Sequence, residues 1–217
     1  MQDKVNIASV KKIPEKLKNK LQAIGIRLYD ADFLNYKYTQ NIPAIEGEVV
    51  FTSQHAVRAY ADIHQANSDA FVINKATLQE AVNAGWHIAE SAENATLLAE
   101  KIITHGTKKV THLCGNIRRK ELKKILTKAG VEIIEIEVYQ KELLNIRLNE
   151  TIDGLMIYSP SGLDAFLQNN ELKKNHPVFC IGTTTAIYTK QLGYENIQVA
   201  EEATMEAVIN KVIEYYK

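Results

Sequence analysis

The chain carries one pattern of strands and turns twice, about 107 residues apart, and this duplication restricts the folds that it can adopt. In the first half, the segment VVFTSQHAV at 49–57 precedes FVINKAT at 71–77. In the second half, LMIYSPSGL at 155–163 precedes VFCIGTTTA at 178–186. Each repeat therefore predicts apolar strands that end in Ser, Thr, Asn or Gly where a helix begins. The equivalent positions are Ser53 with Ser159, His55 with Ser161, Thr77 with Thr185, and Gly85 with Gly193.

The turns at these strand ends favour an anionic ligand. Backbone N–H groups and the positive end of a helix dipole gather where a strand stops and a helix starts. We expect two such edges to form a cleft for a large polyanion. The residues predicted to bind it lie at the carboxyl ends of predicted parallel strands, where open α/β sheets bind ligands. They are Ser53, His55, Thr77, Arg118, Ser159, Ser161, Gly162, Thr184 and Thr185.

These positions also have purely structural interpretations. Ser is a favoured helix N-cap, and both Thr77-Leu-Gln-Glu80 and Ser161-Gly-Leu-Asp164 fit a capping box. Arg118 could lie on a helix surface, and a lone histidine such as His55 is often structural. The Gly-Thr-rich turn at 182–185 lacks the lysine of a P-loop and the glycines of a dinucleotide fingerprint. No nucleophile, base and orienting group can be assembled, so no indispensable catalytic side chain is expected.

The composition excludes several classes of function. The 217 residues can bury one sizeable core or two of about 100 residues each. The 26 Lys and Arg residues balance the 26 Asp and Glu residues, so no global basic field attracts nucleic acid or an anionic membrane. Neither a membrane-spanning stretch nor a leader is evident. Cys114 and Cys180 are predicted to be buried free thiols, and the six histidines show no metal-ligand spacing. We therefore expect a soluble cytoplasmic protein with reduced cysteines and no metal site.

Strands and helices are predicted to alternate along the chain. The expected strands lie at 5–9, 49–52, 70–73, 86–89, 110–114 and 131–139. The expected helices lie at 14–24, 54–64, 77–84, 94–105 and 117–129. Strands joined by such helices require parallel sheets covered on both faces. The predicted fold is α/β, with two small doubly wound domains. The residues leave open whether each repeat folds on itself or exchanges its first β-α-β unit with the other.

Several short motifs, taken in their order and spacing, resemble the uroporphyrinogen-III synthase family over essentially the whole chain. The motifs are Phe51-Thr-Ser-x-x-Ala-Val57, Gly115-x-x-Arg118-x-x-x-Leu122 with Gly130 and Val138-Tyr139, Ser159-Pro-Ser-Gly162, and Ile181-Gly-x-Thr-Thr-Ala186.

This resemblance implies two flavodoxin-like domains joined by a two-stranded connection. Domain 1 would combine residues 1–34 and 143–217, domain 2 would span 39–138, and strands 35–38 and 139–142 would connect them. The implied reaction needs no cofactor: linear hydroxymethylbilane loses water and closes to uroporphyrinogen III, with ring D inverted through a spiro intermediate in an interdomain cleft. This substrate carries eight carboxylates, so it is a polyanion. The resemblance implies a monomer whose partner is this small molecule, without nucleic acid or membrane.

Three features depart from the family's usual pattern. Asn74 stands where a glycine is usual before x-x-Thr, and Ser9-Val-Lys11-Lys12 replaces an Arg-Pro pair. A tyrosine proposed elsewhere as a proton donor has no clear counterpart between Gln140 and Ile157. The acid that acts on the leaving hydroxyl is therefore not assigned. The residues alone also allow a second class of function, a non-catalytic duplicated α/β module that binds a tetrapyrrole or another polyanion.

Overall fold

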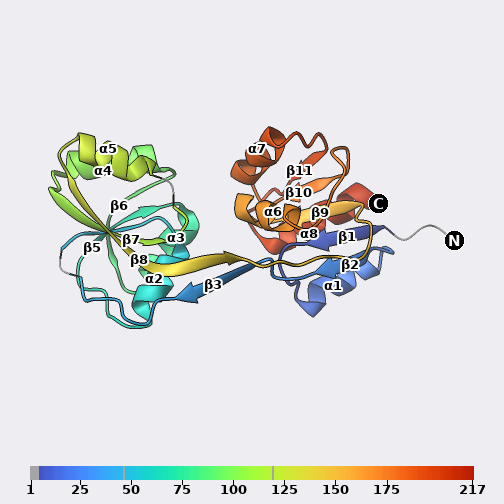
Figure 1. Cartoon of the computed structure of the whole chain (residues 1–217), viewed down its shortest axis with the longest axis horizontal. Helices are drawn as coiled ribbons and strands as arrows, with labels where there is room; N and C mark the ends of the chain where they lie inside the picture. The colour runs from blue at the N-terminus through green and yellow to red at the C-terminus, as the bar shows by residue number, and fades with distance from the viewer. Residues whose placement is uncertain (1–4, 46, 119) are drawn as a thin grey trace. The chain divides into compact units, whose positions relative to one another are not determined.

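The computed structural model describes residues 5–45, 47–118 and 120–217, and it consists of parallel sheets and connecting helices that alternate along the chain (Figure 1). The start of the predicted first domain, residues 1–4, and Arg119 of the Gly-Asn-Ile-Arg-Arg turn lie outside the described residues. The chain divides into two compact units. Unit 1 comprises Met1–Asn35 and Glu142–Lys217, and unit 2 comprises Tyr36–Lys141. The predicted α/β fold is confirmed.

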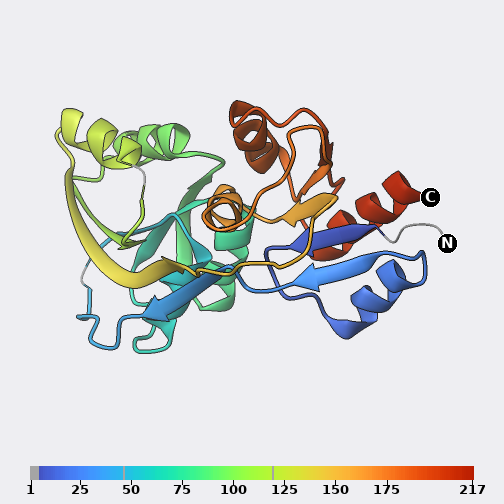
Figure 2. The same cartoon turned by 45° about the vertical axis from the view of Figure 1, so that its right-hand side comes forward.

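Unit 1 is a five-stranded sheet in the order β11-β10-β9-β1-β2, with every pair parallel (Figure 2). Helix α1 contacts α8, and α6 contacts α7. The crossovers run in opposite directions from β1 and from β9, so these two pairs of helices cover opposite faces. The elements are β1 (Asn6–Ser9), α1 (Glu15–Gln22), β2 (Arg27–Asp30), β9 (Gly154–Ile157), α6 (Pro160–Leu167), β10 (Val178–Cys180), α7 (Thr183–Gln191), β11 (Ile197–Val199) and α8 (Met205–Tyr216).

Unit 2 is a six-stranded sheet in the order β3-β8-β7-β4-β5-β6. Helices α2 and α3 lie against one face, over a core that includes Phe51, Tyr60 and Trp86. Helices α4 and α5 cover the other face, around Phe71 and Leu122. The elements are β3 (Leu34–Tyr38), β4 (Val49–Phe51), α2 (Gln54–Ala61), β5 (Asp69–Ile73), α3 (Lys75–Asn83), β6 (His87–Ala92), α4 (Ala95–His105), β7 (Lys109–Gly115), α5 (Glu121–Lys128) and β8 (Glu132–Leu143).

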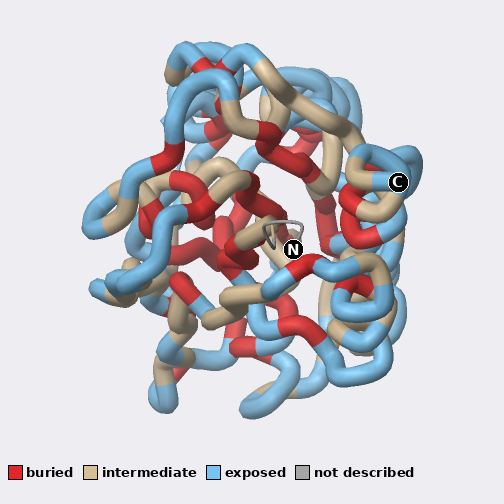
Figure 3. Tube along the Cα trace, turned by 90° about the vertical axis from the view of Figure 1, so that its right-hand side faces the viewer, coloured by how far each residue is buried: buried red, intermediate tan, exposed pale blue. Residues whose placement is uncertain are grey.

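The sheet order shows how the two repeats combine. Strands β1 and β2 open the first repeat, yet they pair with β9, β10 and β11 of the second. Strands β7 and β8 open the second repeat, and they lie beside β4, β5 and β6 of the first. The strands at the middle of both sheets are buried, while the connecting helices expose their outer faces (Figure 3). Each unit therefore contains the opening β-α-β element of one repeat and the remainder of the other.

This exchange creates one topological switch point in each sheet. Strand β1 pairs with β9, and β7 pairs with β4, but the helices that follow the two partners go to opposite faces. A crevice opens above the carboxyl ends of such a pair, and ligands of open α/β sheets bind there. The loops after β1 and β9 are therefore placed to bind a ligand in unit 1, and the loops after β4 and β7 are placed to do so in unit 2.

Two predicted helix starts, those of α3 and α5, are wrong, and one capping box that the sequence allowed is not formed. Helix α3 starts at Lys75 rather than Thr77, because the Asn74 carboxamide accepts the Thr77 N–H at 2.9 Å. The N-cap of α6 is Ser159 rather than Ser161. Asp164 accepts a hydrogen bond from Tyr188 at 2.5 Å and does not complete a capping box.

Helix α5 starts at Glu121, four residues later than predicted. Asn116 holds the preceding loop in a non-helical conformation, since its carboxamide oxygen accepts the N–H groups of Ile117 and Lys141, both at 2.9 Å. Both cysteines are buried free thiols, as predicted. Within the described ranges, no helix combines the length and apolar character needed to cross a lipid bilayer.

Asn74 is the only described non-glycine residue with a positive φ, at φ 64° and ψ 158°. Such a conformation costs an L-residue about 1–3 kcal/mol, and glycine adopts it freely. We expect Asn74→Gly to keep or raise the free energy of unfolding, because the strain is relieved and a Gly N-cap costs only a few tenths of a kcal/mol. Asn74→Ala keeps the strain and loses the cap, so it should lower stability by about 0.5–2 kcal/mol. Urea unfolding measures both variants, and equal losses in the two would contradict the strain at Asn74.

Candidate functional site

In unit 2, the loop after β4 places Ser53 and His55 at the switch point. Ser53 is the N-cap of α2, and its hydroxyl accepts the backbone N–H of His55 at 3.2 Å. The His55 ring stacks on Tyr36, with centroids 3.6 Å apart and planes 9° apart. Its Nδ1 lies 3.0 Å from the Tyr38 hydroxyl. His55 is thus oriented by two tyrosines of β3, which the sequence analysis did not assign to the site.

A third tyrosine, Tyr139 of β8, completes this aromatic cluster. Its ring centroid lies 5.7 Å from His55 and 6.0 Å from Tyr36. Burial raises the pKa of Tyr139, although a hydrogen bond with Ser53 opposes the change. Burial, together with the neighbouring tyrosines, raises the pKa of Tyr36 to about 12. These phenols stay protonated at neutral pH and can donate hydrogen bonds.

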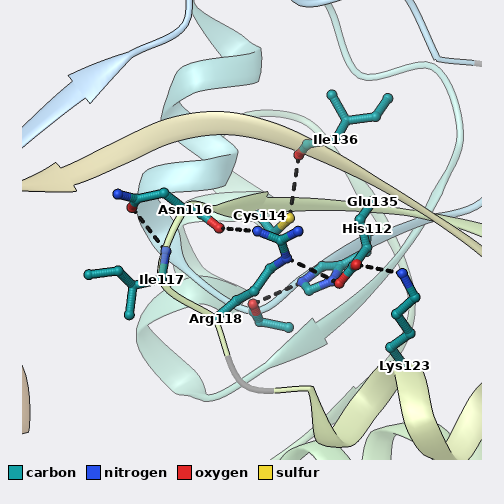
Figure 4. Close-up of polar contacts among 10 residues, drawn as sticks. His112, Cys114, Asn116, Ile117, Arg118, Lys123, Glu135 and Ile136 are labelled. Atoms are coloured by element: carbon teal, nitrogen blue, oxygen red, sulfur yellow. Dashed lines mark hydrogen bonds and ion pairs between the residues drawn. The ribbon is translucent and has the colours of Figure 1, made fainter.

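On the other side of the switch point, the loop after β7 carries Arg118. Its Nε donates to Glu135 Oε1 at 3.2 Å, and its Nη1 donates to the Gly115 carbonyl at 3.0 Å (Figure 4). Lys123 of α5 binds the second carboxylate oxygen of Glu135 at 2.8 Å. Burial acts to raise the pKa of Glu135, but the hydrogen bonds from Lys123 and Arg118 hold it below its usual value. Glu135 therefore remains a carboxylate and anchors Arg118.

A solvent-open pocket of about 570 Å³ lies beside this ion pair. Four cationic side chains and one carboxylate line it, together with a carboxamide: Arg118, Lys120, Lys123, Lys124, Glu135 and Asn116. Helix α5 begins at this pocket without a side-chain cap, so its first N–H groups and its dipole add to the positive potential. The pocket is suited to carboxylates even though the chain has no net charge.

In unit 1, the loop after β9 provides the equivalent turn. The Ser159 hydroxyl accepts the Gly162 N–H at 3.2 Å and lies 3.3 Å from the Ser161 hydroxyl. Gly162 packs closely against Val10, because a Cβ at this position would lie 3.0 Å from Val10 Cγ2 and the valine side chain would have to shift. This contact joins the turn after β9 to the loop after β1.

The loop after β1 adds two lysines that the sequence analysis left outside the site. Lys11 lies 5.6 Å from the centre of the Tyr158 ring, and the Lys12 N–H donates to Asp32 at 3.0 Å. Burial raises the pKa of Tyr158 to about 12. The missed signal is positional: Lys11 and Lys12 follow the opening strand of their repeat, as Arg118 does in the other.

The predicted threonines differ in their accessibility. Thr184 is exposed in the first turn of α7, whose Gly182 N-cap provides no side-chain cap. Thr185 and its repeat equivalent Thr77 are buried, at 4% and 1% exposure. Helix α7 therefore offers an exposed hydroxyl and uncapped N–H groups, while Thr77 and Thr185 support the turns from inside.

The contact between Gly115 and Tyr139 makes a sharp test of this geometry. A Cβ at Gly115 would lie 2.5 Å from the Tyr139 ring, whereas a Cβ at Gly182 would meet no atom within 4 Å. We expect Gly115→Ser to cost about 1–3 kcal/mol through overpacking and to change the near-ultraviolet circular dichroism of the tyrosines. The matched change Gly182→Ser should be neutral or slightly stabilising, since Ser is a favoured N-cap. Equal melting temperatures for the two variants would rule out the packing described here.

Comparison with known proteins agrees with this architecture. The sequence model of the family described as uroporphyrinogen-III synthase HemD matches residues 15–210. A search of curated proteins found no significant match. Three solved structures illustrate the similarity of fold.

The uroporphyrinogen-III synthetase of Helicobacter pylori superposes with a TM-score of 0.66 at 19% identity, with 97% of this chain and 99% of that chain covered. A mutant uroporphyrinogen III synthase of the extremely thermophilic bacterium Thermus thermophilus gives a TM-score of 0.69 at 11% identity, covering 98% of both chains. The wild-type Thermus enzyme in another crystal form gives 0.51 at 12% identity, covering 98% and 96%.

At these identities the structural matches establish the fold, while the family model covers most of the chain. The chain belongs to the uroporphyrinogen-III synthase family, the enzymes that cyclise hydroxymethylbilane in haem biosynthesis.

Proposed function

We propose that the carboxyl edges of both sheets hold one hydroxymethylbilane molecule while it closes with inversion of ring D. Loss of water gives an electrophilic azafulvene, whose methylene carbon is attacked by the substituted α-carbon of the terminal pyrrole, ring D. The resulting spiro-pyrrolenine breaks and recloses with ring D reversed, giving uroporphyrinogen III. The protein acts chiefly by fixing the bilane in the spiro-forming shape, since the free bilane closes unaided to the unrotated isomer.

The observation that carries this proposal is the collection of anion-binding groups at each switch point. Unit 2 offers the basic pocket beside Arg118 and the turn at Ser53. Unit 1 offers Lys11, the turn at Ser159, and the uncapped start of α7 at Thr184. Side arms bearing carboxylates would bind these donors, and the pyrrole rings would lie against the aromatic cluster of His55. Buried Thr77 and Thr185 would support the turns.

Hydrogen-bond donors suit this reaction better than a single strong acid. Donors fixed by the fold stabilise developing charge without reorganising during the reaction. Among the described side chains at these edges, the tyrosines have raised pKa values and remain protonated donors. Cyclisation of the bilane moves no electrons to or from an outside acceptor, so the proposed reaction proceeds without a cofactor.

We also propose that the enzyme works as a monomer in the cytoplasm. The duplication supplies both ligand-binding edges within one chain, so a second copy is not needed to complete the site. The two buried free thiols favour a reducing compartment. Size-exclusion chromatography with light scattering tests the oligomeric state.

The test of this function is an assay with freshly prepared hydroxymethylbilane, scoring isomer III against isomer I. We expect predominant isomer III, and hydrogen exchange with a bound uroporphyrinogen should show protection at both the 53–57 and 159–163 turns. Formation of isomer I alone would contradict the proposed cyclase activity and would favour a non-catalytic module that binds tetrapyrroles. Protection confined to one turn would contradict shared binding while leaving the activity in place.

A single neutral donor should be dispensable. The exposed part of the Ser161 side chain is proposed to donate one hydrogen bond to the substrate, and removing such a bond costs about 0.5–1.5 kcal/mol, or roughly threefold to tenfold in rate. We expect Ser161→Ala to retain isomer III formation at a rate reduced within this range. The control is Thr127→Ala, which removes an exposed hydroxyl near the end of α5, away from the strand ends, and should leave the rate unchanged. Complete loss of activity in folded Ser161→Ala would identify a dedicated catalytic hydroxyl.

A further inference from the structure

Unit 2 contains a cluster of potential metal ligands that the proposed reaction does not use. His112 and Cys114 lie two residues apart on β7 and so point to the same face of the sheet. Glu135 is the register partner of His112 on β8. One ligand atom of each lies within 4.8 Å of the others: the sulfur of Cys114, an imidazole nitrogen of His112 and a carboxylate oxygen of Glu135 (Figure 4). Sequence spacing alone did not reveal this set, because the third member comes from a neighbouring strand.

The imidazole of His112 is the second observation that points to an ion. Its ring lies at 2% exposure, and its Nε2 is 3.1 Å from the Thr52 hydroxyl. Its Nδ1 is buried and has no hydrogen-bond partner among the described residues. The nearest carboxylate oxygen, of Glu135, is 3.6 Å away, beyond hydrogen-bond distance. In the tautomer whose Nε2 carries the proton toward Thr52, the lone pair of Nδ1 faces Glu135. A hydrogen bond at the other ring nitrogen is what orients a metal-bound histidine.

We propose that His112, Cys114 and Glu135 bind a divalent ion of the zinc class. Nitrogen, thiolate and carboxylate donors together suit Zn²⁺ or Co²⁺ rather than Mg²⁺ or Ca²⁺. Tetrahedral bonds of about 2.0–2.3 Å need ligand atoms roughly 3.3–3.8 Å apart, so small side-chain rotations bring this set to bonding distance. Binding releases the thiol proton of Cys114 to solvent and leaves one position for water.

Two cations compensate the charge of Glu135, and an incoming ion would have to compete with them for the carboxylate oxygens. Arg118 Nε occupies Oε1 and Lys123 Nζ occupies Oε2, while their side chains are 31% and 49% exposed. An ion bound through Oε1 would displace Arg118 and could leave Lys123 on Oε2. The pocket that Glu135 lines is open to solvent, but its four cationic side chains oppose the entry of a divalent ion, so binding requires Arg118 to move away from Oε1. Ion binding at Oε1 therefore competes with the contact between Arg118 and Glu135.

Co²⁺ is the appropriate probe, because its thiolate complexes absorb in the near ultraviolet and its tetrahedral complexes absorb in the visible. The reduced full-length protein is titrated with CoCl₂ under argon. We expect one Co²⁺ per chain with both absorptions. Cys114→Ser should lose the thiolate band, whereas Cys180→Ser, which changes the other buried thiol, should keep it.

Two further variants separate ion binding from misfolding. Glu135→Gln should weaken Co²⁺ binding at least tenfold, as even outer-shell changes do at metal sites. Arg118→Met should instead tighten binding several-fold, because it frees Oε1, and Lys120→Met should have less effect since it lines the same pocket without contacting Glu135. Circular dichroism establishes that each variant is folded. Absence of the thiolate band in the wild-type protein, or its persistence in Cys114→Ser, would overturn the proposal, as would weaker binding in folded Arg118→Met.

Discussion

The pairing of exchanged strands at the centre of each sheet is the constraint on which the rest of the structure depends. Pairing of β1 with β9 and of β7 with β4 brings together segments that lie far apart in the sequence. The helices that follow these strands must leave toward opposite faces, and the backbone groups at their starts then surround one crevice. On one side of each crevice, Ser53 or Ser159 caps its helix. On the other side, α1 and α5 begin without a side-chain cap.

That asymmetry explains how a chain with no net charge can bind a polyanion. A capped helix start already has a partner for its N–H groups, so it contributes a fixed hydroxyl and a rigid turn. An uncapped start leaves N–H groups and a dipole for the ligand. The lysines and the arginine are concentrated near these uncapped starts, as Lys11 near α1 and Arg118 near α5 show. Binding strength then comes from local placement and not from a global field, and compensating acidic residues such as Glu201 and Glu214 gather around α8.

The strands and helices could be predicted from the sequence, but the contacts between residues far apart in the sequence could not. Apolar runs at 49–52 and 110–114 and the glycine stops after their helices are local signals, and the corresponding strands are present in the structure. The predicted starts of α3 and α5 are wrong because the carboxamides of Asn74 and Asn116 bind backbone N–H groups through contacts that a sequence motif does not describe. The aromatic cluster joins Tyr36, His55 and Tyr139 from three elements. Its existence depends on the register of β8, which no local pattern encodes.

Glu135 is a largely buried carboxylate at the carboxyl edge of the unit 2 sheet, and its counter-ions affect both the stability of the fold and the position of Arg118. A carboxylate only 13% exposed requires compensation, since removing its counter-ions would leave an unpaired charge in a poorly solvated place. Arg118 supplies that compensation from the loop after β7, and Lys123 supplies it from α5, whose Leu122 also packs in the core beside Ile133 of β8. The loop after β7 is held by this ion pair together with the hydrogen bonds of Asn116, so Arg118 is oriented before any ligand arrives. Under the proposed function, a substrate carboxylate that binds Arg118 would compete with Glu135, and Lys123 would continue to neutralise Glu135. The two cations would then act as a pair, with Lys123 compensating the buried carboxylate while Arg118 binds the ligand.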